Sequence, residues 1–106
     1  MKESVLAKEV DRQLKLLNNC YYVNIHGNGI QRAGVPDRLI CYRGFFIGLE
    51  LKRPDGKGRE SNRQKIEGNK IMDAGGIYAC IDNVADFLDC IWAVDRMLDR
   101  FGELKK

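Results

Sequence analysis

The sequence lacks a long apolar run, has a single histidine and contains no two cysteines in a C-x-x-C arrangement. Its apolar stretches are far shorter than the roughly 18 residues that a membrane-spanning helix needs, and residues 1–4 do not resemble the start of a secretory signal. The 106 residues also contain no repeat or low-complexity tract. We therefore expect a single domain over residues 1–106, in a soluble intracellular protein with no membrane partner.

The four cysteines, at positions 20, 41, 80 and 90, are too far apart in the sequence to form the short ligand loops of a structural zinc site. The only histidine, His26, neighbours none of them. Each cysteine lies within an apolar stretch, so we expect four reduced thiols packed in the core and no disulfide framework.

Charge is unevenly distributed along the chain, although the net charge is only +3. Between positions 38 and 65 there are eight basic and three acidic residues, whereas positions 82 to 99 contain five aspartates and one arginine. A basic centre followed by an acidic segment indicates an anionic partner on one side of the molecule. Two ordinary solvated faces are the alternative.

Apolar and turn-forming residues follow patterns that predict both helices and strands. Leu6, Val10 and Leu14 recur at helical spacing and fall on one face. Arg43-Gly44 separates two strand-like segments by two residues, which is the spacing of a hairpin. The expected elements are a helix at 3–17, strands at 20–25, 37–42 and 45–52, a helix from Ser61 or Asn62 to Gly75-Gly76, a strand at 77–81 and a last helix capped by Asp82 or Asn83.

A two-residue turn at Arg43-Gly44 would pair Asp37 with Glu50 and place Lys52 on the same face of the hairpin. Two opposed carboxylates repel each other across a sheet. A cation between them would relieve the repulsion, and oxygen ligands of this kind suit Mg²⁺ or Mn²⁺. A surface salt bridge among the three side chains, or a slipped register, is the alternative.

Three motifs occur in a fixed order: Gly34-Val35-Pro36-Asp37, then Glu50-Leu51-Lys52, then Gln64 at the start of a helix. In this order they resemble the PD-(D/E)XK nuclease superfamily, and more narrowly its VRR-NUC branch, particularly the small stand-alone phage and bacterial members of that branch. The resemblance implies an α/β fold with a restriction-endonuclease-like αβββαβ core. In that core a central mixed sheet is flanked by helices, and a C-terminal helix follows.

The resemblance also implies roles for individual residues. Asp37, Glu50 and the main-chain carbonyl of Leu51 would bind the metal, Lys52 would position the attacking water, and Gln64 would lie near the scissile phosphate or the water. Relatives carry a further acid on the first helix, for which Glu3 and Glu9 compete. Glu3 shares the inward face of that helix with Leu6 and Leu14, which favours it.

Five basic residues around the motifs are expected to contact phosphates, with solvated surface charge as the alternative. Arg38 is expected to pair with an acid in a structural role, and a catalytic role for His26 is disfavoured. The expected phosphate contacts are Arg53, Lys57, Arg59, Arg63 and Lys65.

The function implied is a Mg²⁺- or Mn²⁺-dependent DNA endonuclease that acts as a homodimer on branched DNA such as four-way junctions, without an organic cofactor. If the protein is phage-encoded, its location is the cytoplasm of a bacterial host. The alternatives are a DNA-binding module that does not cut, and a nuclease for RNA or flaps. The last helix is a candidate for part of the dimer interface, and ordinary core packing is the alternative. The residues concerned are Phe87, Ile91, Trp92, Leu98 and Phe101.

Overall fold

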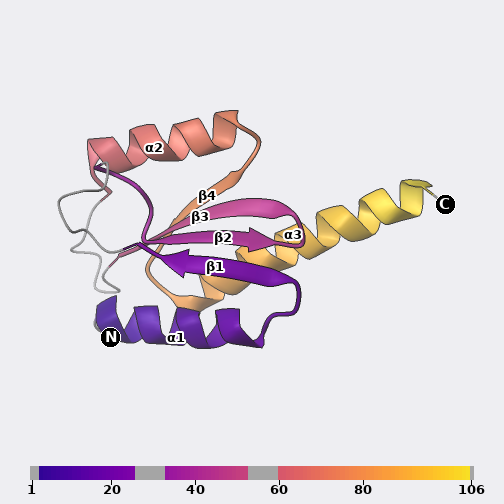
Figure 1. Ribbon diagram of the computed structural model, residues 1–106, viewed down its shortest axis with the longest axis horizontal. Coiled ribbons are helices and arrows are strands. Elements are labelled where there is room, and N and C mark those ends of the chain that lie inside the picture. Colours follow the sequence, from indigo (N-terminus) through magenta and orange to yellow (C-terminus); the bar gives the residue numbers. More distant parts are fainter. Residues whose placement is uncertain (1–2, 26–32, 53–59, 106) are drawn as a thin grey trace.

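The computed structural model describes residues 3–25, 33–52 and 60–105. Its elements follow the expected order and form an α/β fold (Figure 1). They are α1 (Glu3–Leu16), β1 (Cys20–Asn24), β2 (Arg38–Tyr42), β3 (Phe45–Leu51), α2 (Asn62–Asp73), β4 (Ile77–Ile81) and α3 (Val84–Lys105). None of the described helices is long and apolar enough to cross a membrane.

The four strands form one mixed sheet in the order β1-β2-β3-β4. The first three strands are antiparallel, and β4 pairs in parallel with β3. A parallel partner needs a crossover connection, and α2 supplies it. The mixed sheet that the resemblance implied is therefore confirmed.

The β2–β3 hairpin has the predicted register, in which Ile40 pairs with Ile47 and Tyr42 with Phe45. Arg43 and Gly44 have φ values of 50° and 88°. Positive φ at both central residues is typical of the tight turns that match the twist of a hairpin.

The core lies between this sheet and two helices, α1 and α3. Leu6, Val10 and Leu14 of α1 are at most 1% exposed, as their spacing predicted. Phe87 and Ile91 of α3 are also buried in this core. Their predicted role in a dimer interface is therefore wrong, because the sheet already uses this face of α3.

The opposite face of the sheet is covered by α2, which begins at a complete capping box. Ser61 Oγ accepts a hydrogen bond from the Gln64 N–H at 3.1 Å, and Gln64 Oε1 accepts one from the Ser61 N–H at 2.8 Å. Further along α2, Gly68 lies against the ring of Tyr78 on β4. The first turn of α2 is thus held firmly above the end of β3.

The cysteines are all free, but they are not all in the core. Cys20 and Cys90 are partly buried, whereas Cys41 and Cys80 are exposed. The core prediction is wrong for the last two because their side chains lie on the α2 side of the sheet, opposite the core. Apolar neighbours in the sequence did not reveal which face a strand residue occupies.

Candidate active site

Three segments that are distant in the sequence meet at one end of the sheet: the start of β2, the end of β3 and the start of α2 (Figure 1, left). Glu50 lies at this point, next to the last residue of β3, and is only 3% exposed. A buried carboxylate loses hydration, so it needs polar partners nearby.

Glu50 is in contact with two of the predicted site residues. The Nε2 group of Gln64 donates a hydrogen bond to Glu50 Oε1 at 2.7 Å. Lys52 Nζ lies 3.8 Å from the same oxygen. Since the capping box uses the other end of the Gln64 amide, Gln64 connects the helix start rigidly to the carboxylate.

Asp37 reaches the same region from the start of β2. Its Oδ2 accepts a hydrogen bond from the Leu51 N–H at 2.8 Å, and its main-chain carbonyl accepts one from the Ile25 N–H at 2.8 Å. The β2–β3 ladder begins at Arg38 and Leu49. Asp37 therefore approaches β3 through its side chain, one step beyond the ladder.

Two glycines allow the segment before Asp37 to lie close to its neighbours. A Cβ at Gly48 would lie 2.7 Å from Ile71 Cδ1 and 3.0 Å from Pro36 Cγ. A Cβ at Gly34, whose φ is +88°, would lie 2.5 Å from the carbonyl oxygen of Arg63. The Gly-x-Pro-Asp motif is thus packed between β3 and α2, which holds Asp37 in place.

The donors gathered here suit a hard divalent cation. Asp37 and Glu50 contribute carboxylates, and the Leu51 carbonyl is a further oxygen of the kind that Mg²⁺ and Mn²⁺ accept. Within residues 3–25, 33–52 and 60–105, no three His, Cys, Asp or Glu side chains cluster closely enough to hold a metal alone. The set fits an ion that keeps several of its own waters, as Mg²⁺ does.

The third acid remains a prediction. Glu3 is the first residue of α1, but its side chain lies outside the part of the chain that is described. Glu9 is paired on the surface with Arg12, at 2.7 Å.

Arg38 has the structural partner that was expected, and the partner is Asp11 of α1. The guanidinium donates to both carboxylate oxygens, at 2.8 and 3.1 Å, and to the Asp37 carbonyl at 3.0 Å. Arg38 is only 8% exposed. It thereby ties α1 to the segment that carries Asp37.

The contribution of β4 to this site was not predicted from the sequence. Cys80 is the ladder partner of Glu50 on this strand, and the Tyr78 hydroxyl donates a hydrogen bond to the Glu60 carboxylate. Cys80 is partly open to solvent, but the desolvation it undergoes among its neighbours, followed by the charge of Glu60, raises its pKa to about 11. The crossover helix was the signal that could have placed β4 in parallel beside β3.

The predicted phosphate contacts divide into two groups. Arg63 and Lys65 are exposed on the first turns of α2, close to Gln64. Arg53, Lys57 and Arg59 lie outside the described residues, as does His26.

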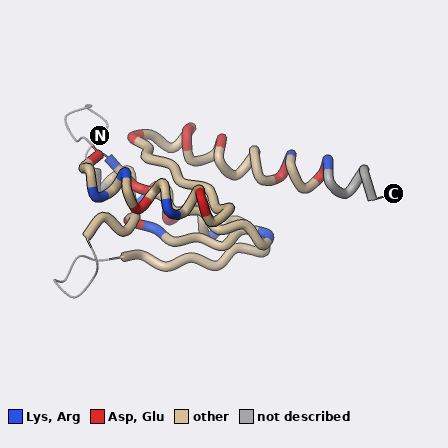
Figure 2. Tube along the Cα trace, turned by 90° about the horizontal axis from the view of Figure 1, so that it is seen from above, with Lys and Arg blue, Asp and Glu red and all other residues tan. Residues whose placement is uncertain are grey.

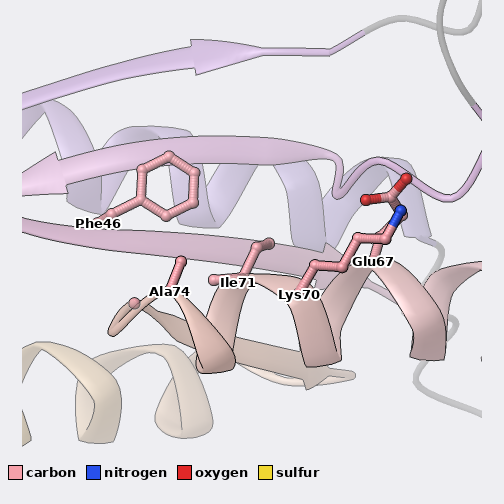
Figure 3. A pocket seen from close by; sticks show the side chains of 6 residues that line it. Phe46, Glu67, Lys70, Ile71 and Ala74 are labelled. Carbon is pink, nitrogen blue, oxygen red and sulfur yellow. The ribbon is translucent and has the colours of Figure 1, made fainter.

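A separate small hollow lies between β3 and the C-terminal half of α2 (Figure 3). Its volume is about 240 Å³, and Phe46, Ile71 and Ala74 line it together with Glu67, Lys70 and Gly76. Ligand pockets usually measure about 300 to 1,000 Å³. This hollow is smaller and none of the predicted site residues line it.

Comparison with known proteins supports the fold. No family model matches the sequence, and no curated protein does. Among solved structures, one described as a VRR_NUC domain matches with a TM-score of 0.68 and 20% identity, over 86% of this chain and 95% of that chain. The chain therefore has the fold of a VRR_NUC domain, as the resemblance of its motifs implied.

Proposed function

We propose that this chain is a metal-dependent nuclease of the VRR-NUC type that hydrolyses phosphodiester bonds in the DNA backbone. The observation that carries the proposal is the meeting of Glu50, Lys52 and Gln64 around one buried carboxylate oxygen, with Asp37 bound to the next residue of the same strand.

Asp37, Glu50, the Leu51 carbonyl and Glu3 would hold Mg²⁺ or Mn²⁺. When bound, such an ion polarises the phosphate and stabilises the charge that develops on it. The donor set supports this choice, because all of these ligands are oxygens.

Two other side chains have distinct roles in the proposal. The Lys52 ammonium is close enough to Glu50 to be held by it, and its N–H groups orient the attacking water and a phosphate oxygen. Gln64 uses both ends of its amide on the protein, at Ser61 and at Glu50. We therefore propose that it is a positioning residue that fixes the Glu50 carboxylate.

DNA would be held through its phosphates. Arg63 and Lys65 lie exposed next to the site, and Arg53, Lys57 and Arg59 belong to the segment between β3 and α2. Contacts of this kind position the backbone and carry no sequence information. Recognition would therefore rest on DNA shape and on the number of sites in the assembly.

A single domain over residues 1–106 would provide one cutting site, so a homodimer is needed to cut two strands at once. On this basis we propose branched DNA, such as four-way junctions, as the substrate. The alternative of a DNA-binding module without cleavage is disfavoured, because Asp37, Glu50 and Lys52 would have no reason to occur together there.

A cleavage panel tests the proposal. Supercoiled plasmid, linear duplex, single strands, a 5′ flap, a four-way junction and RNA would each be incubated with Mg²⁺, Mn²⁺ or EDTA. We expect metal-dependent cutting of the junction, reduced roughly 100-fold by Lys52→Ala. Lys15→Ala, at an exposed lysine at the end of α1, is the matched control and should cut like the wild type.

The other outcomes each contradict part of the proposal. Binding without cutting would favour the non-catalytic module. Equal cutting by Lys52→Ala and wild type would refute the role of Lys52. Preferred cutting of RNA or of the flap would replace the proposed substrate.

A further inference from the structure

The last helix, α3, carries an exposed face that the proposed nuclease site does not use. Its buried positions, Phe87, Ile91 and Val94, face the core. On the other side Trp92 is 58% exposed. Figure 1 shows that the C-terminal half of α3 extends beyond the sheet, which makes the molecule 47 Å long but only 28 and 23 Å across.

The exposed residues form one stripe along the helix. Their spacing of three or four residues places them on neighbouring turns of the same face. We call this set the α3 stripe; its members are Ala85, Asp89, Trp92, Arg96 and Arg100, all exposed.

Charge changes sign along the α3 stripe. From Val84 to Asp95 the helix contains aspartates but no lysine or arginine, and Arg96 and Arg100 follow. In Figure 2 the blue of basic residues accordingly appears on α3 only toward its C-terminal half. A helix face that is acidic at one end and basic at the other is complementary to itself when one copy is reversed.

We propose that two copies of this chain pair through antiparallel α3 stripes, about a two-fold axis near Trp92. The reversed pairing places Asp89 opposite Arg96 of the second copy, and the two-fold axis repeats this pair. A parallel arrangement would place like charges together. This pairing specifies an interface for the homodimer of the proposed function. It rests on the proposed function only in that two copies of the chain must associate.

Trp92 is well suited to the centre of such a contact. The Arg96 guanidinium lies over its ring, 4.6 Å from the centroid. Tryptophan and arginine dominate binding energy at interface centres, and the stacking orders both side chains before association. The neighbouring Ala93 is small, which lets two helices approach closely. The α3 stripe runs over the 16 residues from Ala85 to Arg100, which offers a contact about 24 Å long.

A second copy fits this face better than DNA does. Asp86, Asp89 and Asp99 lie on or beside the stripe and are exposed, so they would repel phosphates. Asp89 of this set gains a partner in a reversed helix, where Arg96 of the second copy lies opposite it.

The test is a charge swap measured by sedimentation equilibrium on the full chain, in EDTA and without DNA. The wild type should be dimeric. Asp89→Arg and Arg96→Asp should each weaken the dimer roughly tenfold, because a like pair replaces an attractive pair at two symmetric places. The double variant Asp89→Arg/Arg96→Asp should recover most of the loss. Lys8→Asp, an exposed reversal on α1, should leave the dimer unchanged.

Three results would overturn the inference: a monomeric wild type at every concentration, single reversals that leave the dimer intact, or a folded double variant that recovers nothing. Circular dichroism confirms folding in each case. A monomer that cuts DNA would overturn only the pairing, and a dimer that never cuts would overturn only the nuclease.

Discussion

The replacement of Glu50 by glutamine separates a metal-binding carboxylate from a structural ion pair. Glu50 and Lys52 have side-chain exposures of 4% and 18%, with 3.8 Å between Nζ and Oε1. At such a separation the attraction is about 4 kcal/mol for an effective dielectric constant of 20. Removing each charge from water costs several kcal/mol. The attraction therefore does not exceed the combined desolvation cost, so the ion pair by itself adds little to the free energy of unfolding.

In the wild type, Gln64 Nε2 donates to Glu50 Oε1 at 2.7 Å. A glutamine at position 50 keeps a side-chain oxygen that can accept the same hydrogen bond. A hydrogen bond to a neutral acceptor is weaker than one to a charge by about 1 kcal/mol. A neutral glutamine is not repelled by Asp37, which raises the free energy of unfolding by a fraction of a kcal/mol to about 1 kcal/mol. We therefore expect Glu50→Gln to unfold within about 1 kcal/mol of the wild type in urea with EDTA.

Magnesium should distinguish the two proteins. An ion at 100 times its dissociation constant raises the unfolding free energy by about 2.7 kcal/mol. We expect that increment in the wild type and its loss in Glu50→Gln. Glu67→Gln is the matched control, because Glu67 is also buried, at 5% exposure, but lies outside the proposed ligand set; it should keep the increment.

The metal interpretation would fail if Glu50→Gln lost about 3 to 5 kcal/mol in EDTA, the cost of breaking a structural buried pair. It would also fail if Mg²⁺ stabilised Glu50→Gln as much as the wild type.

Two further predictions concern β4 and the helix above it. A Cβ at Gly68 would lie 2.5 Å from the Tyr78 ring, so in Gly68→Ala an overpacking cost of about 1–3 kcal/mol should exceed the helix-propensity gain of about 1 kcal/mol and lower the urea midpoint. The pKa of Cys80 is raised from 9.0 to about 11, so its thiol should react with iodoacetamide roughly 100-fold more slowly at pH 8 in the folded protein than in the unfolded protein. In the folded protein the rate should rise about tenfold for each pH unit up to pH 10. Peptide mapping by mass spectrometry measures both rates.

Each of these predictions has its own control. Asn69→Ala changes an exposed position next to Gly68 and should leave the urea midpoint equal or slightly higher. A similar increase in Gly68→Ala would mean that the Tyr78 ring moves aside without lowering stability. Equal native and unfolded alkylation rates at pH 8 would show that the surroundings of Cys80 do not suppress its thiolate.

Much of the fold was predictable because its signals are local. The helical spacing of Leu6, Val10 and Leu14 identified the buried face of α1, and Arg43-Gly44 predicted the register of the hairpin. These patterns depend on the period of a helix and on the geometry of a two-residue turn, both of which are written in adjacent residues.

Other features could not be predicted because they depend on contacts between distant segments. The pairing of Arg38 with Asp11 requires α1 to cross the start of β2. The exposure of Cys41 depends on how much of the sheet α2 covers. The division of α3 into a buried side with Phe87 and an open side with Trp92 depends on where the sheet ends.

The sequence by itself determined the order of elements, the hairpin register and the motif residues Asp37, Glu50 and Lys52, since periodicity and turn chemistry act over a few positions. Only the tertiary structure decided which groups meet. The capping box of α2 directs Gln64 onto Glu50, and the parallel crossover places Cys80 beside it. Packing sets these contacts, and packing is a property of surfaces brought together from the whole chain.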